Sequence, residues 1–196
     1  MQVSFRNQES KLPGYLPQFR SLPVTSAPAR TKRKRITAQI AENDRIGSVN
    51  DYDLRFLFCY DIFPPRILKF FGEWERESRT MRPGDVIVQQ SQVVPLSFAP
   101  KLIFSVRVLS VRQSASEAGF SYGTLQGHPE AGTNDFSILI SKNMLLAAIE
   151  TYAGPGLLLT RLLWPFVELY VNSVNRRALM RMKTRFLESN PSLAET

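Results

Sequence analysis

The residues best suited to chemistry are His128 and Glu130, two positions apart in the segment Gly127-His-Pro-Glu-Ala-Gly132. Glycines at both ends permit positive φ and so predict a tight loop between two strand-like segments. A histidine and a carboxylate at this spacing could form an acid/base pair that moves a proton or polarises a ligand. The loop could equally use its histidine to hold backbone groups in place. Both interpretations stay open, since no nucleophile accompanies the pair.

Other side chains could line a binding cavity near this loop. Tyr122 and Thr124 share one face of the strand that leads into it, so their hydroxyls would either face a ligand or be satisfied within a core. Aromatic residues elsewhere could complete an apolar lining, and we place Phe58, Phe104, Phe120 and Trp164 there. Trp74 is expected to pack against a sheet, with contact to a ligand as the alternative.

Several chemistries are excluded by composition. One histidine and one cysteine, Cys59, permit no internal disulfide and no Cys/His metal site, so we expect no metal and no cofactor. Cys59 lies in an apolar run and is interpreted as a buried thiol. The lack of paired cysteines favours a reducing compartment, and we predict a cytoplasmic protein. The most apolar long stretch, residues 153–174, contains Arg161 and Glu168, which argues against a transmembrane span.

The net charge of +8 is concentrated at the two ends. Residues 1–35 carry +7 and end in Lys32-Arg33-Lys34-Arg35, whereas residues 36–156 carry −2 and residues 157–196 carry +3. Residues 1–43 also contain recurrent prolines and no sustained period, so we predict a mostly irregular basic arm. The four basic residues could contact an anionic membrane weakly, and nucleic acid is a less favoured partner.

The remaining sequence predicts strands followed by one long helix. Residues 54–60 suit a strand, and Ile67, Phe70, Phe71 and Trp74 have the spacing of a helical face. Strand patterns follow at residues 85–94, 101–112, 118–125 and 136–140, and residues 144–152 fit either a strand or a helix. A helical stripe then runs from Leu157 to Leu187, where Pro165 should kink the helix or mark its true start.

A run of strands followed by a helix predicts an α+β fold. A curved antiparallel sheet of about six strands around the C-terminal helix would cover every apolar face. This layout, called helix-grip, is similar to that of the START and birch-pollen-allergen superfamily. We expect one such domain at residues 44–188, followed by a tail at residues 189–196.

The segment around the His-Glu loop carries a second resemblance. It is similar to the signature Gly-Tyr-Gly-Thr-Leu-x-Gly-His-x-Glu-x-Gly of an uncharacterised domain family, with Ser121 in place of the first glycine. The matching positions are Tyr122, Gly123, Thr124, Leu125, Gly127, His128, Glu130 and Gly132, followed by Phe136. This resemblance implies no activity.

Three functions therefore compete. The first is binding of a small hydrophobic or lipid-like ligand in a cavity between the sheet and the C-terminal helix, since such cavities are common binding sites. The second is an enzyme of cyclase, isomerase or hydrolase type that uses His128 and Glu130 in that cavity. The third is a scaffold or membrane-peripheral protein that acts through its basic ends. The residues leave open whether a reaction is catalysed and what the oligomeric state is.

Overall fold

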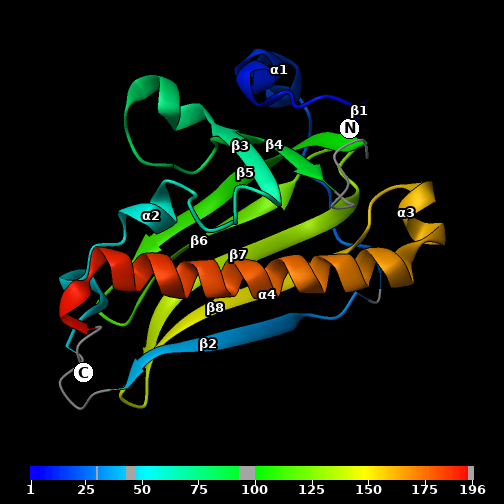
Figure 1. The fold of residues 1–196 in the computed structure, drawn as a ribbon. Coiled ribbons are helices and arrows are strands. Elements are labelled where there is room, and N and C mark those ends of the chain that lie inside the picture. Colours follow the sequence, from blue (N-terminus) through cyan, green and yellow to red (C-terminus); the bar gives the residue numbers. More distant parts are fainter. Residues whose placement is uncertain (30, 43–46, 93–99, 194–196) are drawn as a thin grey trace.

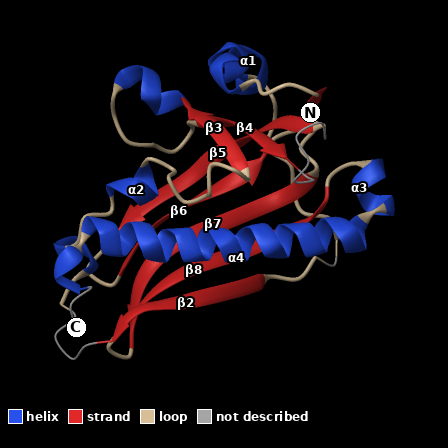
Figure 2. Cartoon of the chain, in the orientation of Figure 1, coloured by secondary structure: helices blue, strands red, loops and turns tan. Residues whose placement is uncertain are grey.

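One antiparallel sheet with a long helix across its inner face forms the body of the protein (Figures 1 and 2). The computed structural model describes residues 1–29, 31–42, 47–92 and 100–193. Seven strands follow the order β2-β8-β7-β6-β5-β4-β3, and β1 pairs with the start of β5. The strands are β1 (Gln2–Ser4), β2 (Lys34–Glu42), β3 (Leu68–Gly72), β4 (Val86–Gln92), β5 (Lys101–Gln113), β6 (Glu117–Thr124), β7 (Glu130–Ser141) and β8 (Met144–Pro155).

In the part of the chain that the structure describes, four α-helices accompany the sheet. The long C-terminal helix α4 is preceded directly by the short α3 (Figure 1). Helix α1 packs on the face of the sheet opposite to α4, since its buried side chains belong to a separate core cluster. The helices are α1 (Leu12–Arg20), α2 (Arg55–Phe58), α3 (Leu158–Leu162) and α4 (Trp164–Ser189), with 3₁₀ turns at Glu9–Lys11, Val49–Asp51, Glu73–Glu77 and Pro191–Leu193. The predicted helix-grip architecture is confirmed, with one strand more on the main path than expected.

Strand alternation places the main core between the sheet and α4. In β5, Phe104, Val106 and Val108 point into this core, as their spacing predicts. The β6–β7 register sets Phe120 opposite Phe136, and the two rings stack at 5.3 Å between centroids. The segment at residues 144–152, which fitted both patterns, is a strand. The predicted strand at 85–94 is confirmed to residue 92, and its last two residues lie outside the described range.

The start of the C-terminal helix is set by Pro165. This residue occupies the first turn of α4, where proline costs no hydrogen bond, and α3 ends just before it. The predicted apolar stripe packs only along its C-terminal half, where Ala178, Met182 and Phe186 are buried. Its N-terminal leucines do not face the core, so this part of the prediction is wrong.

The expectation of an irregular arm at residues 1–43 is wrong. Leu12, Leu16 and Phe19 lie on one face of α1 and form a second core against the outer face of β4 and β5. Residues 34–42 form the edge strand β2, which pairs with β8 through most of its length. Apolar alternation at Ile36, Ala38 and Ile40 supports this strand, but the adjacent basic run and the prolines obscured it.

Two further element predictions are wrong for identifiable reasons. Residues 54–60 contain the helical turn α2, since Phe56, Leu57 and Tyr60 are buried at a spacing that no flat strand provides. Residues 68–72 form β3 rather than a helix. Phe70 packs against the main core and Phe71 against the outer one, so a strand with apolar side chains on both faces also matches the spacing of a helical face.

Candidate functional site

The loop that joins β6 to β7 begins with a tight turn. His128 N–H donates to the carbonyl oxygen of Leu125 at 3.0 Å, and Gly127 has φ of 84°. At the far side of the loop Gly132 has φ of 142°, and a Cβ there would lie 2.1 Å from the carbonyl oxygen of Tyr152. The signature glycines therefore allow β7 to approach β8 closely and hold the loop in one conformation.

His128 is buried, and its side chain holds the loop in place through a hydrogen bond with the backbone. Its Nδ1 lies 2.9 Å from the backbone N–H of Glu130 and accepts a hydrogen bond from it. Its ring packs edge-on against Phe104, with 4.4 Å between the centroids. Burial lowers the pKa of His128 to about 3, so the imidazole is neutral at physiological pH. A neutral ring that accepts from the backbone fixes the loop and does not act as an acid toward Glu130.

Thr124 fixes the same loop from the other side. Its Oγ1 accepts from the backbone N–H of Gly132 at 2.9 Å and lies 2.6 Å from the hydroxyl of Thr25. Tyr122 is buried in the main core, and its hydroxyl shares a hydrogen bond with Tyr60, which accepts in turn from Gln89 at 2.7 Å. Both hydroxyls are thus satisfied by the protein.

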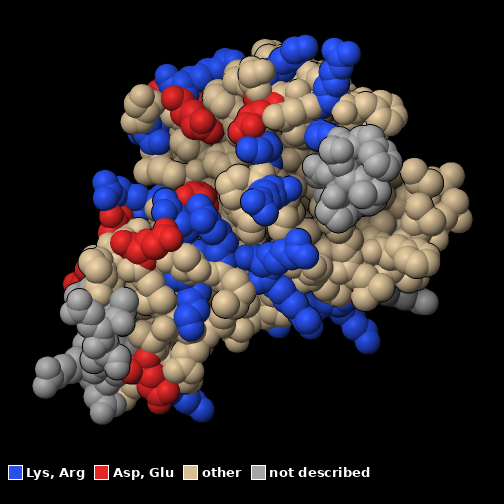
Figure 3. Space-filling model, viewed as in Figure 1, with Lys and Arg blue, Asp and Glu red and all other residues tan. Residues whose placement is uncertain are grey.

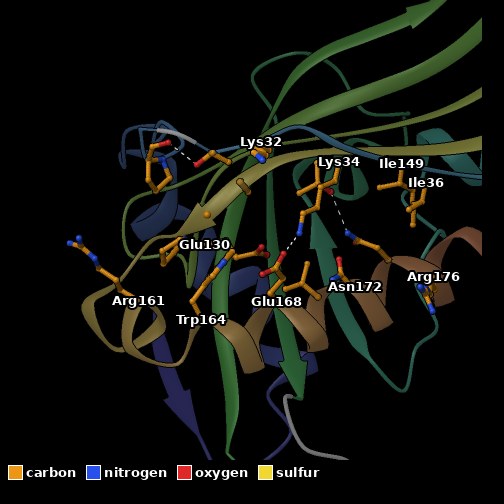
Figure 4. Close-up of a pocket in the computed structure, with 18 of the residues that line it drawn as sticks. Lys32, Lys34, Ile36, Glu130, Ile149, Arg161, Trp164, Glu168, Asn172 and Arg176 are labelled. Carbon is orange, nitrogen blue, oxygen red and sulfur yellow. Dashed lines mark hydrogen bonds and ion pairs between the residues drawn. The ribbon is translucent and has the colours of Figure 1, made fainter.

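A pocket of about 810 Å³ lies between the β2–β8 edge of the sheet and the N-terminal half of α4 (Figure 4). The inward positions of β2 and β8 form one wall, and α4 forms the other. Its apolar surface includes Ile36, Ile149, Ala153, Trp164 and Val171. Thr151 and Asn175, whose side chains lie 3.3 Å apart, contribute polar atoms. The pocket thus lies between the sheet and the C-terminal helix, which is the place where the sequence led us to expect a cavity.

Charged side chains surround this pocket. Lys34 and Glu168 form an ion pair across it, from β2 to α4 (Figure 4). Lys32, Arg161 and Arg176 also line it, and none of the three forms an ion pair with a described residue. Figure 4 shows the Arg161 guanidinium pointing away from the other labelled side chains, at the rim. The pocket therefore has more cations than its acids neutralise.

Glu130 is the loop residue that reaches the pocket. Its side chain is half-buried and closely surrounded by protein, and this burial raises the pKa of its carboxyl to about 7. No described basic residue forms an ion pair with it. Below neutral pH Glu130 is therefore largely a neutral acid that can donate a hydrogen bond into the pocket.

The predicted site residues divide into two groups. Trp164 and Glu130 line the pocket, whereas the other five do not and belong to the core or to the hydrogen bonds that hold the loop. These five are Tyr122, Thr124, His128, Trp74 and Phe104. Phe58 and Phe120 likewise pack with the main core. The lining is consequently less aromatic and more charged than predicted.

The basic run at residues 32–35 is not a solvated tail. Lys32 and Lys34 line the pocket, whereas Arg33 turns outward to Glu150 and Arg35 lies in a small cleft on the outer face with Arg112. This alternation follows from the extended backbone at and before β2. Extending the alternation of Ile36, Ala38 and Ile40 backward along the chain would have predicted that Lys32 and Lys34 face inward.

Metal-binding clusters and the thiol of Cys59 are weaker candidates for a functional site. Within the described ranges no cluster of His, Cys, Asp and Glu residues could hold a metal ion. Cys59 is exposed at the end of α2, contrary to prediction, because the chain turns there instead of continuing as a strand. Partial desolvation and the charge of Glu75 raise the pKa of its thiol. Among the described helices none is both long and apolar enough to cross a membrane.

Residues 56–181 match the family described as Domain of unknown function (DUF1990), so the chain belongs to this family. Two solved structures are similar to it, each at 13% identity. One is the ginseng major latex-like protein 151 from Panax ginseng, with a TM-score of 0.43, over 80% of this chain and 98% of that one. The other is protein Ms6760 from Mycobacterium smegmatis, with a TM-score of 0.47, over 86% and 99%. No curated protein matches the sequence.

Proposed function

We propose that this member of the DUF1990 family binds a small amphiphile, with an apolar chain and an anionic head, in the pocket between the sheet and α4. The observation that supports this most is the pairing of an apolar wall with unneutralised cations around one pocket. Its volume lies within the range of pockets that hold small molecules.

The apolar chain of the ligand would lie against the inward side chains. Ile36 and Ile149 are partners across the β2–β8 ladder, and Val171 and Trp164 face them from α4. Each buried methylene of a ligand gains about 0.8 kcal/mol, so a medium-length chain gives useful affinity.

The anionic head would lie among the cations. Glu168 is already paired with Lys34, which leaves Lys32, Arg161 and Arg176 available for a carboxylate, sulfate or phosphate. Glu130 would repel such a head if ionised. Because the pKa of Glu130 is about 7, it can instead donate its proton to the head in a hydrogen bond below that pH.

The geometry does not favour the enzyme that uses His128 and Glu130 together. The two side chains meet through the backbone of Glu130, and only Glu130 reaches the pocket. An acid/base pair needs both groups within reach of one substrate atom. A cytoplasmic location stays a prediction from the sequence.

A titration with dodecanoate and its methyl ester tests the proposal. The two probes share one chain and differ in the charge of the head. We expect wild-type protein to bind dodecanoate more tightly than the ester, and Lys32→Gln with Arg161→Gln to remove most of that difference. Arg33→Gln is the matched control, since this cation is adjacent in sequence and points away from the pocket. Equal binding of the two probes would contradict an anionic head.

A further inference from the structure

An exposed apolar surface lies beside the pocket, on α3 and the first turns of α4. Leu158 and Leu162 are 75% and 74% exposed, and Phe166 is 74% exposed. We call this surface the apolar ridge, and it consists of Leu158, Leu159, Leu162, Leu163, Phe166 and Leu169. The spacing of three and four residues joins these side chains into one continuous face. Single exposed leucines are common, but six adjacent large apolar side chains mark an interaction surface.

The ridge is distinct from the core-facing side of the same helix. Within α4, Trp164, Glu168 and Val171 face the pocket, while Phe166 and Leu169 point outward. Figure 3 shows that the end of the molecule with α3 carries no visible charge in that view, whereas Lys and Arg side chains gather over the middle of α4. The first turns of α4 therefore present apolar side chains both to the pocket and to the outer surface. Its last turns present apolar side chains mainly to the core.

We propose that the apolar ridge inserts into the interface of an anionic membrane. Charge complementarity identifies the partner. Arg161 lies within the ridge and Lys32 lines the adjoining pocket, and neither forms an ion pair with a described residue. A second copy would bring cations of the same sign together across a symmetric contact. An anionic lipid surface instead attracts each of these cations while the leucines and Phe166 enter the acyl region.

The fold holds the ridge rigidly relative to the pocket. The carbonyl oxygen of Pro129 accepts from Gly156 N–H at 2.9 Å and from the hydroxyl of Thr160 at 2.8 Å. Thr160 also caps α3 through the N–H of Leu157 at 3.0 Å. The loop that carries Glu130 thus anchors the helix that carries the ridge. Docking on a bilayer would bring the pocket mouth, where Arg161 and Trp164 lie, next to the lipid headgroups.

Vesicle co-sedimentation of the full chain tests this inference. The probes are vesicles of phosphatidylcholine alone and of phosphatidylcholine mixed with phosphatidylserine. We expect wild-type protein to bind the mixed vesicles and to bind more weakly as salt is added, because screening weakens the attraction of cations to lipid. Trp164 fluorescence should shift to the blue on binding, whereas Trp74 is already buried.

The variants Leu162→Ser and Phe166→Ser together should weaken vesicle binding at least tenfold. The matched control is Met180→Ser, since Met180 is 57% exposed and lies in the C-terminal half of the same helix, beyond the ridge. All three side chains are exposed, so the variants should fold, which circular dichroism checks.

Three outcomes would overturn the inference. In the first, wild-type protein binds vesicles with and without phosphatidylserine equally. In the second, the ridge variants bind the mixed vesicles as tightly as wild type does. In the third, wild-type protein is a dimer and the ridge variants are monomers. The dodecanoate titration is separate from this assay, because soluble ligand can enter the pocket without a membrane. Failure of one proposal would therefore be distinguishable from failure of the other.

Discussion

The imidazole of His128 accepts a hydrogen bond from the backbone N–H of Glu130 at 2.9 Å, and this contact defines the role of both residues. Burial keeps the histidine neutral, and the contact fixes the backbone from which the carboxyl of Glu130 reaches the pocket. Two residues that looked like one acid/base pair thus have different functions. His128 holds the loop, and Glu130 lines the pocket.

Replacement of His128 by alanine should destabilise the fold. The variant leaves the Glu130 N–H without its partner and removes the ring that packs on Phe104. We expect a loss on the order of 2–3 kcal/mol in the free energy of unfolding, measured by urea denaturation at about pH 8. Unchanged stability combined with complete loss of dodecanoate binding would instead make His128 a ligand contact.

The low pKa of His128 predicts how stability depends on acid. Its folded pKa of about 3 lies below the ordinary value of 6.5, so the unfolded chain binds a proton that the folded chain does not. Stability should therefore fall as pH decreases from about 6.5 toward 3, by several kcal/mol in all. The contribution is isolated by comparing unfolding of wild type with His128→Ala across this range. Parallel curves for the two proteins would show that other groups cause the acid sensitivity.

Glu130 should produce the opposite dependence. Its folded pKa of about 7 lies above the ordinary 4.5, so its contribution to stability is complete below about 4.5 and is lost as pH rises to 7. Glu130→Gln should then be more stable than wild type at about pH 8, on the order of 2 kcal/mol, with no gain at acid pH. Wild-type affinity for dodecanoate should also fall around pH 7, and the glutamine variant should lack that step. Identical pH profiles for the two proteins would refute the raised pKa.

Gly132 should not tolerate a side chain. A Cβ would overlap the Tyr152 carbonyl oxygen at 2.1 Å and sit at a positive φ, so Gly132→Ala should cost at least about 3 kcal/mol or prevent folding. Gly14→Ala is the control, because nothing lies within 4 Å of a Cβ in α1 and alanine favours a helix. Thermal melting compares the two. Equal melting temperatures would mean that β7 can move away from β8.

The sequence predicted the parts of the fold that depend on local periodicity. The alternation of β5 and the boundary at Pro165 follow from side-chain spacing alone.

The errors in the predicted elements arose where one segment contributes side chains to two different surfaces. Phe70 and Phe71 fill separate cores, and the leucines of the ridge have a core-like period but face outward. Lys32 and Lys34 were grouped with Arg33 and Arg35 by charge, although strand geometry separates them. The pocket itself joins residues from β2, β7, β8 and α4, a combination that only the folded chain brings together.

A calorimetric titration of dodecanoate into wild-type protein and Ala153→Phe tests the central claim most directly. Ala153 lines the pocket from β8 and is half-buried, so the larger side chain fills the pocket without removing a contact. Binding to wild type that is abolished or reduced at least tenfold in Ala153→Phe, with stability preserved, is the predicted result. Equal affinity in the two proteins, or no binding to wild type, would contradict a ligand site between the sheet and α4.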